Sequence, residues 1–330
     1  MASVVTASQL RLISEIKADS VAMSADDQLR DGLAIVDKAA GWTSHDVVAK
    51  ARGILHNRKI GHSGTLDPDA TGLLLLGVGR ATRLLRFLTI LPKTYVGDIV
   101  LGTETSTLDA SGDIVATFEM SAVTLEQVRT TAARFVGEIM QIPPMVSAVK
   151  VGGRRLHQIA REGGEVEREP RPVTIHSLAI DDVVGLPGVF RATVTCSSGT
   201  YIRTLAADIG RALGGGAHLT NLRRIAIGTF ELSDANPLDD IVVRPITDVM
   251  RDYSSVTVVG ELAEAVAHGK VLDRLALGLG PNQGGELPPG PWAVCDQMGD
   301  LLAVYEAHRS GTVKPSVVVA PATGVAGAQS

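Results

Sequence analysis

The order of the short apolar segments is the feature that most constrains the fold of this chain. Apolar or alternating runs of strand length lie at residues 33–36, 73–78, 95–101, 189–195 and 225–230. Helical spacing appears between only some of these runs, so no regular strand–helix–strand repeat emerges. The pattern therefore favours an α+β domain, with a mixed, mostly antiparallel central sheet and flanking helices, over a doubly wound parallel sheet.

Three helices are predicted from their start signals. Thr43 with Asp46, and Thr124 with Gln127, have the spacing of a capping box, in which two residues satisfy each other's free backbone groups. A third helix is expected from Tyr201 onward, directly after an alternating strand. These helices are the elements expected to cover the sheet.

The length of 330 residues suggests two domains, since a domain usually holds about 100–200 residues. We expect five parts: an N-terminal extension, a main domain, a polar insertion within it, a small β-rich domain and a disordered tail. Their boundaries are 1–31, 32–238, 141–171, 239–320 and 321–330. The insertion is expected to be functional, because excursions of that length usually are.

Several classes of protein are excluded by what the sequence lacks. No apolar run reaches the roughly 18–20 residues that cross a bilayer, and no secretory signal is expected at the start. The two cysteines, Cys196 and Cys295, are far apart, which argues against a disulfide framework and a zinc site and fits the cytoplasm. No Gly-rich nucleotide-binding motif is present. We therefore expect a cytoplasmic protein without metal or cofactor.

Charge is distributed unevenly along the chain, although the net charge is −5. Between residues 52 and 93 only Asp67 and Asp69 oppose a basic set, and the balance reverses after Glu231. The basic set comprises Arg52, Arg58, Lys59, Arg80, Arg83, Arg86 and Lys93. Such a region can bind phosphates, or it can be an ordinary solvated surface.

The strongest candidate for chemistry is the loop GHSGTLDPDATG at residues 61–72. Its three glycines permit a tight backbone, and Asp67 stands there near His62 and among basic residues. A carboxylate so placed can act as a nucleophile or a base. The alternative is structural, because Asp followed by Pro is a common opener of turns and helices.

Four other side chains can complete such a site. Arg203 lies near a helix start, where a cation is unfavourable, so a carboxylate partner is expected; an ordinary surface arginine is the alternative. Tyr95 and Tyr201 follow polar residues and can stack on a flipped base, although a core tyrosine is the more common case. Leu222 can pack on a base or belong to the core.

Taken together, these segments resemble the bacterial TruB family, the tRNA pseudouridine-55 synthases. The resemblance runs in order from Leu33 to Phe230. The segments that carry it are DKAAGWTS at 37–44, the Asp67 loop, KTY at 93–95, QIPPMVSAVK at 141–150, AREG at 160–163 and SSGTYIRTLAADIG at 197–210. It implies a pseudouridine-synthase fold followed by a PUA-like C-terminal domain.

The resemblance also implies roles for individual residues. Asp67 matches the catalytic aspartate, Tyr95 the tyrosine that stacks on the target base and assists proton removal, and Arg203 the arginine paired with the carboxylate. The substrate-binding candidates are His62, Tyr95, Tyr201 and Leu222. The candidates for contact with the RNA backbone are Lys38, Arg83, Lys150, Arg154 and Arg155. Lys38 occupies a motif position for which a structural role is also expected.

The chain departs from the family pattern at three positions. Ala39 stands where proline is usual, and Val146 and His157 stand where tyrosine is usual. These changes affect loop stiffness and stacking on RNA by the insertion rather than the chemistry.

The implied reaction breaks the N1–C1′ bond of one uridine, turns the uracil and rejoins it through C5, so it needs neither cofactor nor metal. We expect Arg203 to keep Asp67 ionised by lowering its pKa. Attack at C1′, attack at C6, and proton removal at C2′ to give a glycal all remain open.

The implied substrate is the T arm of tRNA, bound by a monomer without guide RNA. Two other functions stay open: a tRNA-folding chaperone, which needs the basic surface but not Asp67, and an RNA-guided synthase.

Overall fold

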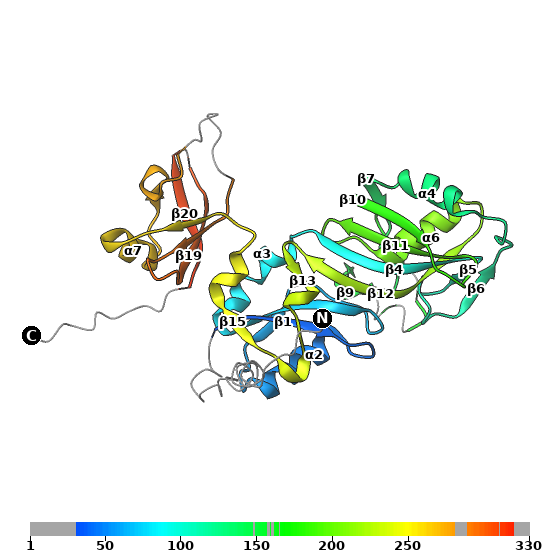
Figure 1. Cartoon of the computed structure of the whole chain (residues 1–330). Coiled ribbons are helices and arrows are strands. Elements are labelled where there is room, and N and C mark those ends of the chain that lie inside the picture. Colours follow the sequence, from blue (N-terminus) through cyan, green and yellow to red (C-terminus); the bar gives the residue numbers. More distant parts are fainter. Residues whose placement is uncertain are drawn as a thin grey trace, which may run out of the picture.

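The computed structural model describes residues 31–147, 149–156, 159, 162–164, 166–280, 289–309 and 311–319. One 11-stranded sheet dominates it (Figure 1). Its main path runs through β14 (Asn236–Pro237), β1 (Gly32–Lys38), β3 (Thr71–Val78), β12 (Ala217–Ile227), β4 (Lys93–Leu101), β11 (Val189–Cys196), β10 (Arg171–Asp182) and β7 (Gly137–Gln141). Three short strands join its sides: β2 (Ile60–His62) on β3, β13 (Phe230–Glu231) on β12, and β15 (Val243–Pro245) on β1.

Neighbouring strands of this sheet are antiparallel, except for β1 with β14 and β12 with β3. The predicted α+β class with a mixed, mostly antiparallel sheet is therefore confirmed. The parallel pair β12–β3 matters for the site, because it brings Arg223 and Arg224 beside Thr71 and Gly72 at the end of the Asp67 loop.

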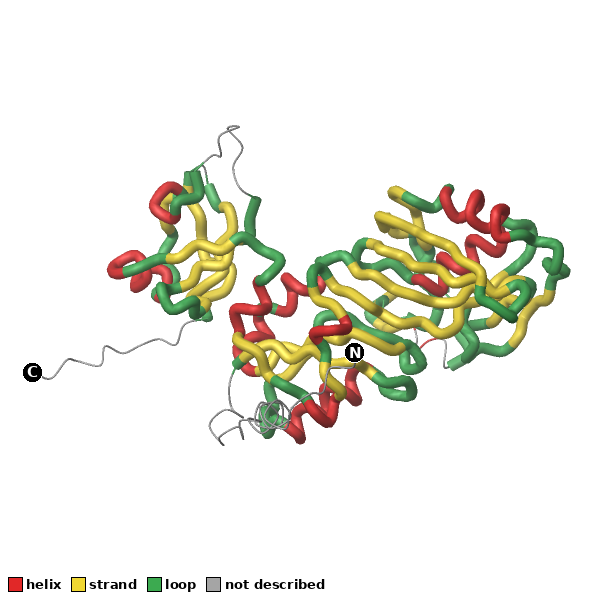
Figure 2. Tube along the Cα trace, in the orientation of Figure 1, coloured by secondary structure: helices red, strands yellow, loops and turns green. Residues whose placement is uncertain are grey.

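The helices lie where the capping signals predicted them. Both capping boxes form, at the starts of α2 (Ser44–Ile54) and α4 (Leu125–Ala133), and α6 (Ile202–Ala212) begins directly after Tyr201. Helix α2 packs on β1 and β3, whereas α4 and α6 cover the sheet near β4, β10, β11 and β12 (Figure 2). Two short elements, η2 (Gly79–Arg83) and α3 (Leu85–Thr89), follow β3.

Two predicted elements differ from the structure. The strand expected at 225–230 is the end of the longer β12, and a turn at Gly228 and Thr229 separates it from β13. The first half of β12 was not predicted as strand, because its polar residues interrupt the apolar alternation. The loop expected at 61–72 is shorter, because its first two residues belong to β2 and its last two belong to β3.

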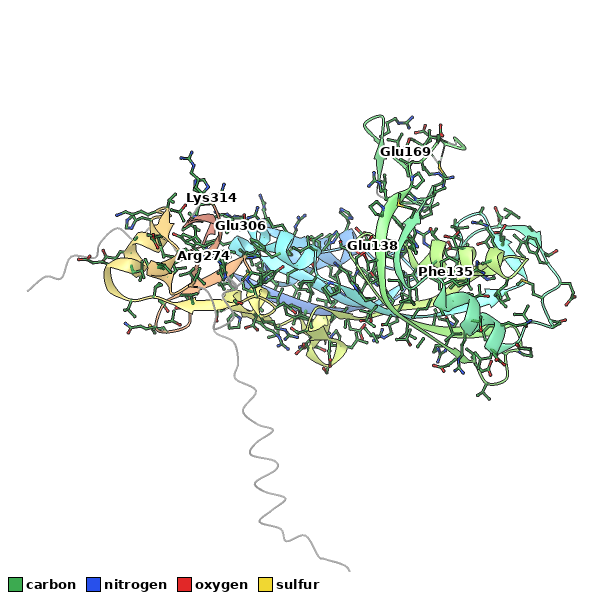
Figure 3. The ribbon with its side chains drawn as sticks, turned by 90° about the horizontal axis from the view of Figure 1, so that it is seen from above. Phe135, Glu138, Glu169, Arg274, Glu306 and Lys314 are labelled. Carbon is green, nitrogen blue, oxygen red and sulfur yellow. The ribbon has the colours of Figure 1, made fainter. Side chains whose placement is uncertain are left out.

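The predicted insertion forms an arm that stands out from the body of the protein (Figure 3). Glu138 on β7 lies at its base, and Glu169, just before β10, lies farther out. A short hairpin of β8 (Lys150–Val151) and β9 (Arg154–Arg155) lies within it. His157 is outside the described residues. A second small hairpin, β5 (Thr103–Thr105) with β6 (Ile114–Thr117), lies between β4 and α4.

The C-terminal part forms a separate 5-stranded sheet, as expected for a PUA-like module (Figure 1). Its order is β16 (Ser255–Thr257), β18 (Trp292–Cys295), β19 (Leu301–Ala307), β20 (Thr312–Val318) and β17 (Leu272–Asp273), accompanied by α7 (Gly260–Ala267) and η6 (Leu275–Leu277). The β-rich character expected for this part of the chain is confirmed.

Short elements that follow residue 238 contact the large sheet. Strand β15 pairs with β1 of the large sheet, and η5 (Ile246–Met250) packs beside β1 and α3. The short elements η3 (Leu232–Asp234) and η4 (Leu238–Asp240) precede them. The pairing of β15 was not visible in the sequence, because a three-residue strand carries too little periodicity to be recognised.

One apolar core joins the two sheets. Phe87 and Leu88 from α3 and Met250 from η5 share a buried cluster with Val304 and Val317 of the small sheet. The small module is thus packed against the main domain.

The predicted N-terminal extension and C-terminal tail lie almost wholly outside the described residues. The exception within the extension is Asp31, whose carboxylate pairs with Arg80. None of the helices in the described part of the chain has the length and apolar character needed to span a bilayer.

Candidate active site

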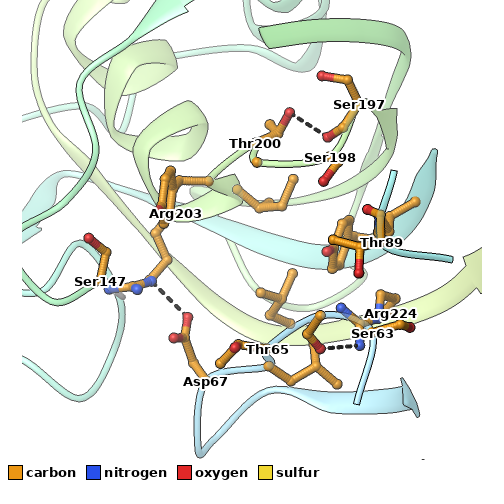
Figure 4. Close-up of a pocket in the computed structure, with 18 residues that line it drawn as sticks. Ser63, Thr65, Asp67, Thr89, Ser147, Ser197, Ser198, Thr200, Arg203 and Arg224 are labelled. Atoms are coloured by element: carbon orange, nitrogen blue, oxygen red, sulfur yellow. Dashed lines mark hydrogen bonds and ion pairs between the residues drawn. The ribbon is translucent and has the colours of Figure 1, made fainter. Parts of the chain in front are cut away.

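A pocket of about 260 Å³ opens where the Asp67 loop, β4, the start of α6 and β12 meet (Figure 4). Asp67, Tyr95, Tyr201, Leu222 and Arg203 all line it. They come from segments far apart in the sequence, so the sheet topology is what assembles them. Five candidate residues are therefore brought to one place.

The Asp67 loop is held from beneath by buried polar groups. Lys38 is 1% exposed, and its ammonium donates to the carbonyls of Ala39 at 3.0 Å, Trp42 at 2.7 Å and Pro68 at 2.9 Å. Ser44 Oγ accepts from Leu66 N at 2.8 Å. These bonds fix the backbone on both sides of Asp67 and connect its loop to the start of α2.

Arg203 is the partner of Asp67. Its Nε lies 3.0 Å from Asp67 Oδ2 and 3.4 Å from Asp109 Oδ2 (Figure 4 draws the first pair). Its other nitrogens donate to the carbonyls of Thr107 at 2.9 Å and Val146 at 2.8 Å. With 4% of its side chain exposed, Arg203 is fully engaged by the protein. The prediction that a cation near a helix start has a carboxylate partner is confirmed.

The pKa of Asp67 shifts in the direction opposite to our expectation. Burial raises it above the usual aspartate value, and the negative charge of Asp109 adds to this, while Arg203 opposes both. Arg203 therefore limits the rise instead of producing a net lowering. The side chain of Asp67 is 40% exposed and lines the pocket, so the carboxylate remains accessible to a substrate.

Tyr95 lies on β4 between β11 and β12, opposite Val194 and Arg224. Burial raises its pKa, and the nearby Arg224, whose guanidinium carbon is 6.0 Å from the ring centre, opposes the rise. Arg224 is itself 1% exposed and donates to Leu73 O at 2.7 Å and Gly64 O at 3.2 Å. Tyr95 is thus a neutral phenol with a cation beside its ring.

Tyr201 is positioned through its backbone. The amide of Gln141, 1% exposed, accepts from Tyr201 N at 2.9 Å and donates to Tyr201 O at 3.2 Å. This two-point contact joins the base of the arm to the start of α6. The ring of Tyr201 is left to line the pocket.

Leu222 reaches the pocket because β12 is irregular at this point. Its register with β4 shifts between Thr220 and Arg223, and Asn221 adopts a left-handed φ of 53°. The Asn221 side chain donates to Asp98 Oδ2 at 2.9 Å, which holds the bulge. Bulges commonly re-aim a side chain near an active site. This one turns Leu222 toward the same cavity as Asp67.

His62 lies beside the pocket on β2. Its Nδ1 accepts from Gly64 N at 3.3 Å, and its ring meets His45 edge-on at 5.4 Å between centroids. Burial lowers its pKa to about 4, and the charges of His45 and Arg224 act in the same direction. His62 is therefore a neutral ring at physiological pH.

The candidates for RNA-backbone contact have different surroundings. Every ammonium proton of Lys38 is donated to a carbonyl, so it supports the loop and has none left for a phosphate. Arg83 is exposed after β3, with no described carboxylate in ion-pair range. Arg154 pairs with Glu162 at 2.5 Å. The side chains of Lys150 and Arg155 lie outside the described part of the structure.

Four residues of the site were not found from the sequence: Asp109, Gln141, Arg224 and Lys93. Lys93 is 5% exposed, lines the pocket and donates to Leu91 O at 2.7 Å, and burial lowers its pKa to about 8. Two of them had a sequence signal: Lys93 lies two residues before Tyr95, and Gln141 opens the QIPPMVSAVK segment. The others depend on contacts across the sheet.

Comparison with known proteins agrees with this geometry. Residues 52–202 match the model of the TruB family pseudouridylate synthase N-terminal domain, and residues 203–247 match that of the tRNA pseudouridylate synthase B C-terminal domain. The chain therefore belongs to the TruB family of tRNA pseudouridine synthases and is an isomerase.

Two relatives named tRNA pseudouridine synthase B illustrate the match. The one from Mycobacterium tuberculosis strain H37Rv is 40% identical over 88% of this chain and 97% of its own. The one from Streptomyces coelicolor is 45% identical over 84% of this chain and 94% of its own. A chain in the crystal structure of a Cbf5-Nop10-Gar1 complex shares the fold, with a TM-score of 0.65 and 26% identity over 86% of this chain and 80% of that chain.

Proposed function

We propose that this enzyme converts uridine 55 in the T loop of tRNA to pseudouridine, with Asp67 as the nucleophile. The ion pair between Asp67 and Arg203, both of which line a pocket of about 260 Å³, is the observation that carries the proposal. The relatives named tRNA pseudouridine synthase B supply the substrate class.

Asp67 must be ionised to act as a nucleophile or base. Arg203 holds its carboxylate in one orientation and offsets the cost of burying its charge. In the overall reaction the N1–C1′ bond breaks, a C5–C1′ bond forms, C5 loses a proton and N1 gains one. Attack at C1′, attack at C6 and formation of a glycal each begin with the same oriented carboxylate.

Tyr95 and Leu222 are proposed to hold the extruded uracil between them, since both line the pocket from adjacent strands. The raised pKa of Tyr95 makes it a neutral phenol in the resting enzyme. It can therefore accept the C5 proton only if the phenolate that forms first is stabilised, and Arg224 is the cation placed to do so.

The RNA is proposed to bind without a guide, to a monomer. The arm at 141–171 would close over the T arm, while Lys150, Arg154 and Arg155 contact phosphates and His62 meets the remodelled loop. Tyr201 would line the pocket from the other side. We assign catalysis to the large sheet, whose elements line the pocket.

The test is tritium release from C5-labelled uridine in unmodified tRNA, using the bare protein. Wild type should release tritium, and Asp67→Asn should not. A transcript with cytidine at position 55 should also release none, which tests the site. If Asp67→Asn turns over, the nucleophile assignment is wrong. If wild type is inactive but Asp67→Asn speeds tRNA folding, the chaperone function replaces the synthase.

A further inference from the structure

An exposed aromatic side chain lies next to the catalytic loop but outside the uridine pocket. Trp42 is 37% exposed, although tryptophan is one of the largest apolar side chains and is usually well covered. It precedes Thr43, the cap of α2, and does not line the pocket.

The backbone of Trp42 belongs to the same rigid unit as Asp67. The ammonium of Lys38 bonds Trp42 O at 2.7 Å and Pro68 O at 2.9 Å, and Gly41 N donates to Pro68 O at 3.0 Å. Residue 42 therefore stays at a fixed distance from the nucleophile's loop.

The surroundings of Trp42 suit a nucleic-acid base. The ammonium of Lys50 lies over the indole at 5.3 Å from the ring centre, which is a cation–π contact. His45, exposed in the first turn of α2, stands edge-on to His62. An aromatic face beside cationic and imidazole groups is the combination that stacks unpaired bases.

We propose that Trp42 is a stacking surface for an unpaired base of the RNA substrate, one that lies outside the uridine pocket. Lys50 lies over the indole and orients it, while its own charge is held by Asp239. This inference rests on the proposed function for the class of ligand, an RNA with an opened loop. It adds a contact that the chemistry itself does not require.

A structural role for Trp42 is the competing explanation. The residue before a helix cap often packs on the first turn as a hydrophobic staple. Such packing needs apolar volume but no aromatic face. Leucine should therefore replace Trp42 in a staple but not in a stack, whereas phenylalanine should serve in both.

The chain offers a direct probe, because Trp42 and Trp292 are its two tryptophans and Trp292 is only 1% exposed. Binding is measured with unmodified tRNA and full-length protein carrying Asp67→Asn, so that no turnover occurs. We expect tRNA to quench tryptophan fluorescence, and Trp42→Phe to remove this quenching. Val184→Ala, at a turn residue that is 98% exposed, is the control and should leave the quenching by tRNA unchanged.

The affinity for tRNA distinguishes base stacking by Trp42 from packing as a hydrophobic staple. Trp42→Leu should weaken tRNA binding by about 5- to 150-fold, the usual range for one base stacked on an aromatic ring. Trp42→Phe should stay close to wild type, and the melting temperature should be similar in both variants. In the active enzyme, Trp42→Leu should raise KM for tRNA while kcat is kept.

Two outcomes would overturn the inference: equal affinities for the Phe, Leu and wild-type proteins, or weaker binding that only follows a lower melting temperature. Failure of the proposed function would appear differently, as tight tRNA binding without tritium release by wild type.

Discussion

Replacing Arg203 with lysine tests how far the site depends on the geometry of one guanidinium. Three nitrogens of Arg203 point in different directions, toward two carboxylates and the carbonyls of Thr107 and Val146. A lysine ammonium is a single point on a longer, flexible stem, so it cannot reach both carbonyls and still contact Asp67. Arg203→Lys should therefore keep the charge but lose two of the four contacts.

The expected cost follows from those contacts. A hydrogen bond to a charged group contributes about 1.5–3 kcal/mol, and two losses would amount to about 3–6 kcal/mol. Water reaches this region, since Asp67 is 40% and Asp109 23% exposed, and it replaces part of what is lost. We expect the free energy of unfolding to fall by about 2–4 kcal/mol. Misplacement of the carboxylate should lower kcat by about 100-fold or more.

Urea unfolding followed by circular dichroism measures the free energy of unfolding. Single-turnover tritium release at saturating enzyme measures the rate of the reaction, under conditions where the variant is folded. A variant that is destabilised yet reacts at the wild-type rate would refute the reasoning, because the guanidinium would then support the fold without orienting Asp67. Arg211→Lys is a matched control: Arg211 lies on the same helix and pairs with Glu104 at 2.8 Å.

Three further results are expected. The pKa of Asp67 is raised, so kcat should fall with decreasing pH already above the usual aspartate range; Asp109→Asn removes a like charge and should move this acid limb to lower pH in a pH–rate profile. Burial lowers the pKa of Lys38 from 10.5 to about 8, so between these two pH values the unfolded protein binds more protons than the folded protein. Urea titrations should therefore show the free energy of unfolding rising with pH across this window, and rising less in Lys38→Met. Gly72→Ala should unfold at least about 2 kcal/mol more easily, because its φ is 101° and a Cβ would meet Arg224 O at 2.2 Å; unchanged thermal unfolding would contradict this.

Local signals predicted local structure well. The capping boxes at Thr43 and Thr124 involve groups three residues apart, so the sequence carries everything they need. The aspartate loop was predicted as a site through its resemblance to a family, whereas its physics alone favoured an ordinary turn. The pairing of Arg203 was inferred from an unfavourable charge near a helix start, and the structure shows the partner.

Contacts across the sheet could not be predicted in the same way. The bulge at Asn221 depends on Asp98, which is more than a hundred residues away in the chain. Asp109 approaches Arg203 only because of how the segment after β5 is folded, and Gln141 finds Tyr201 only when the arm meets α6. The direction of the Asp67 pKa shift was missed for the same reason, since burial and a second carboxylate are properties of the folded site.

The core shared by the two sheets has a consequence for folding. Phe87 and Leu88 are 4% and 0% exposed, and they share their buried cluster with η5 and with residues of the small sheet. Cutting the chain before β16 would leave this apolar surface open to water, so the large sheet is not a self-sufficient folding unit. We therefore expect one cooperative unfolding transition for the two parts, in contrast to modules strung on a flexible linker.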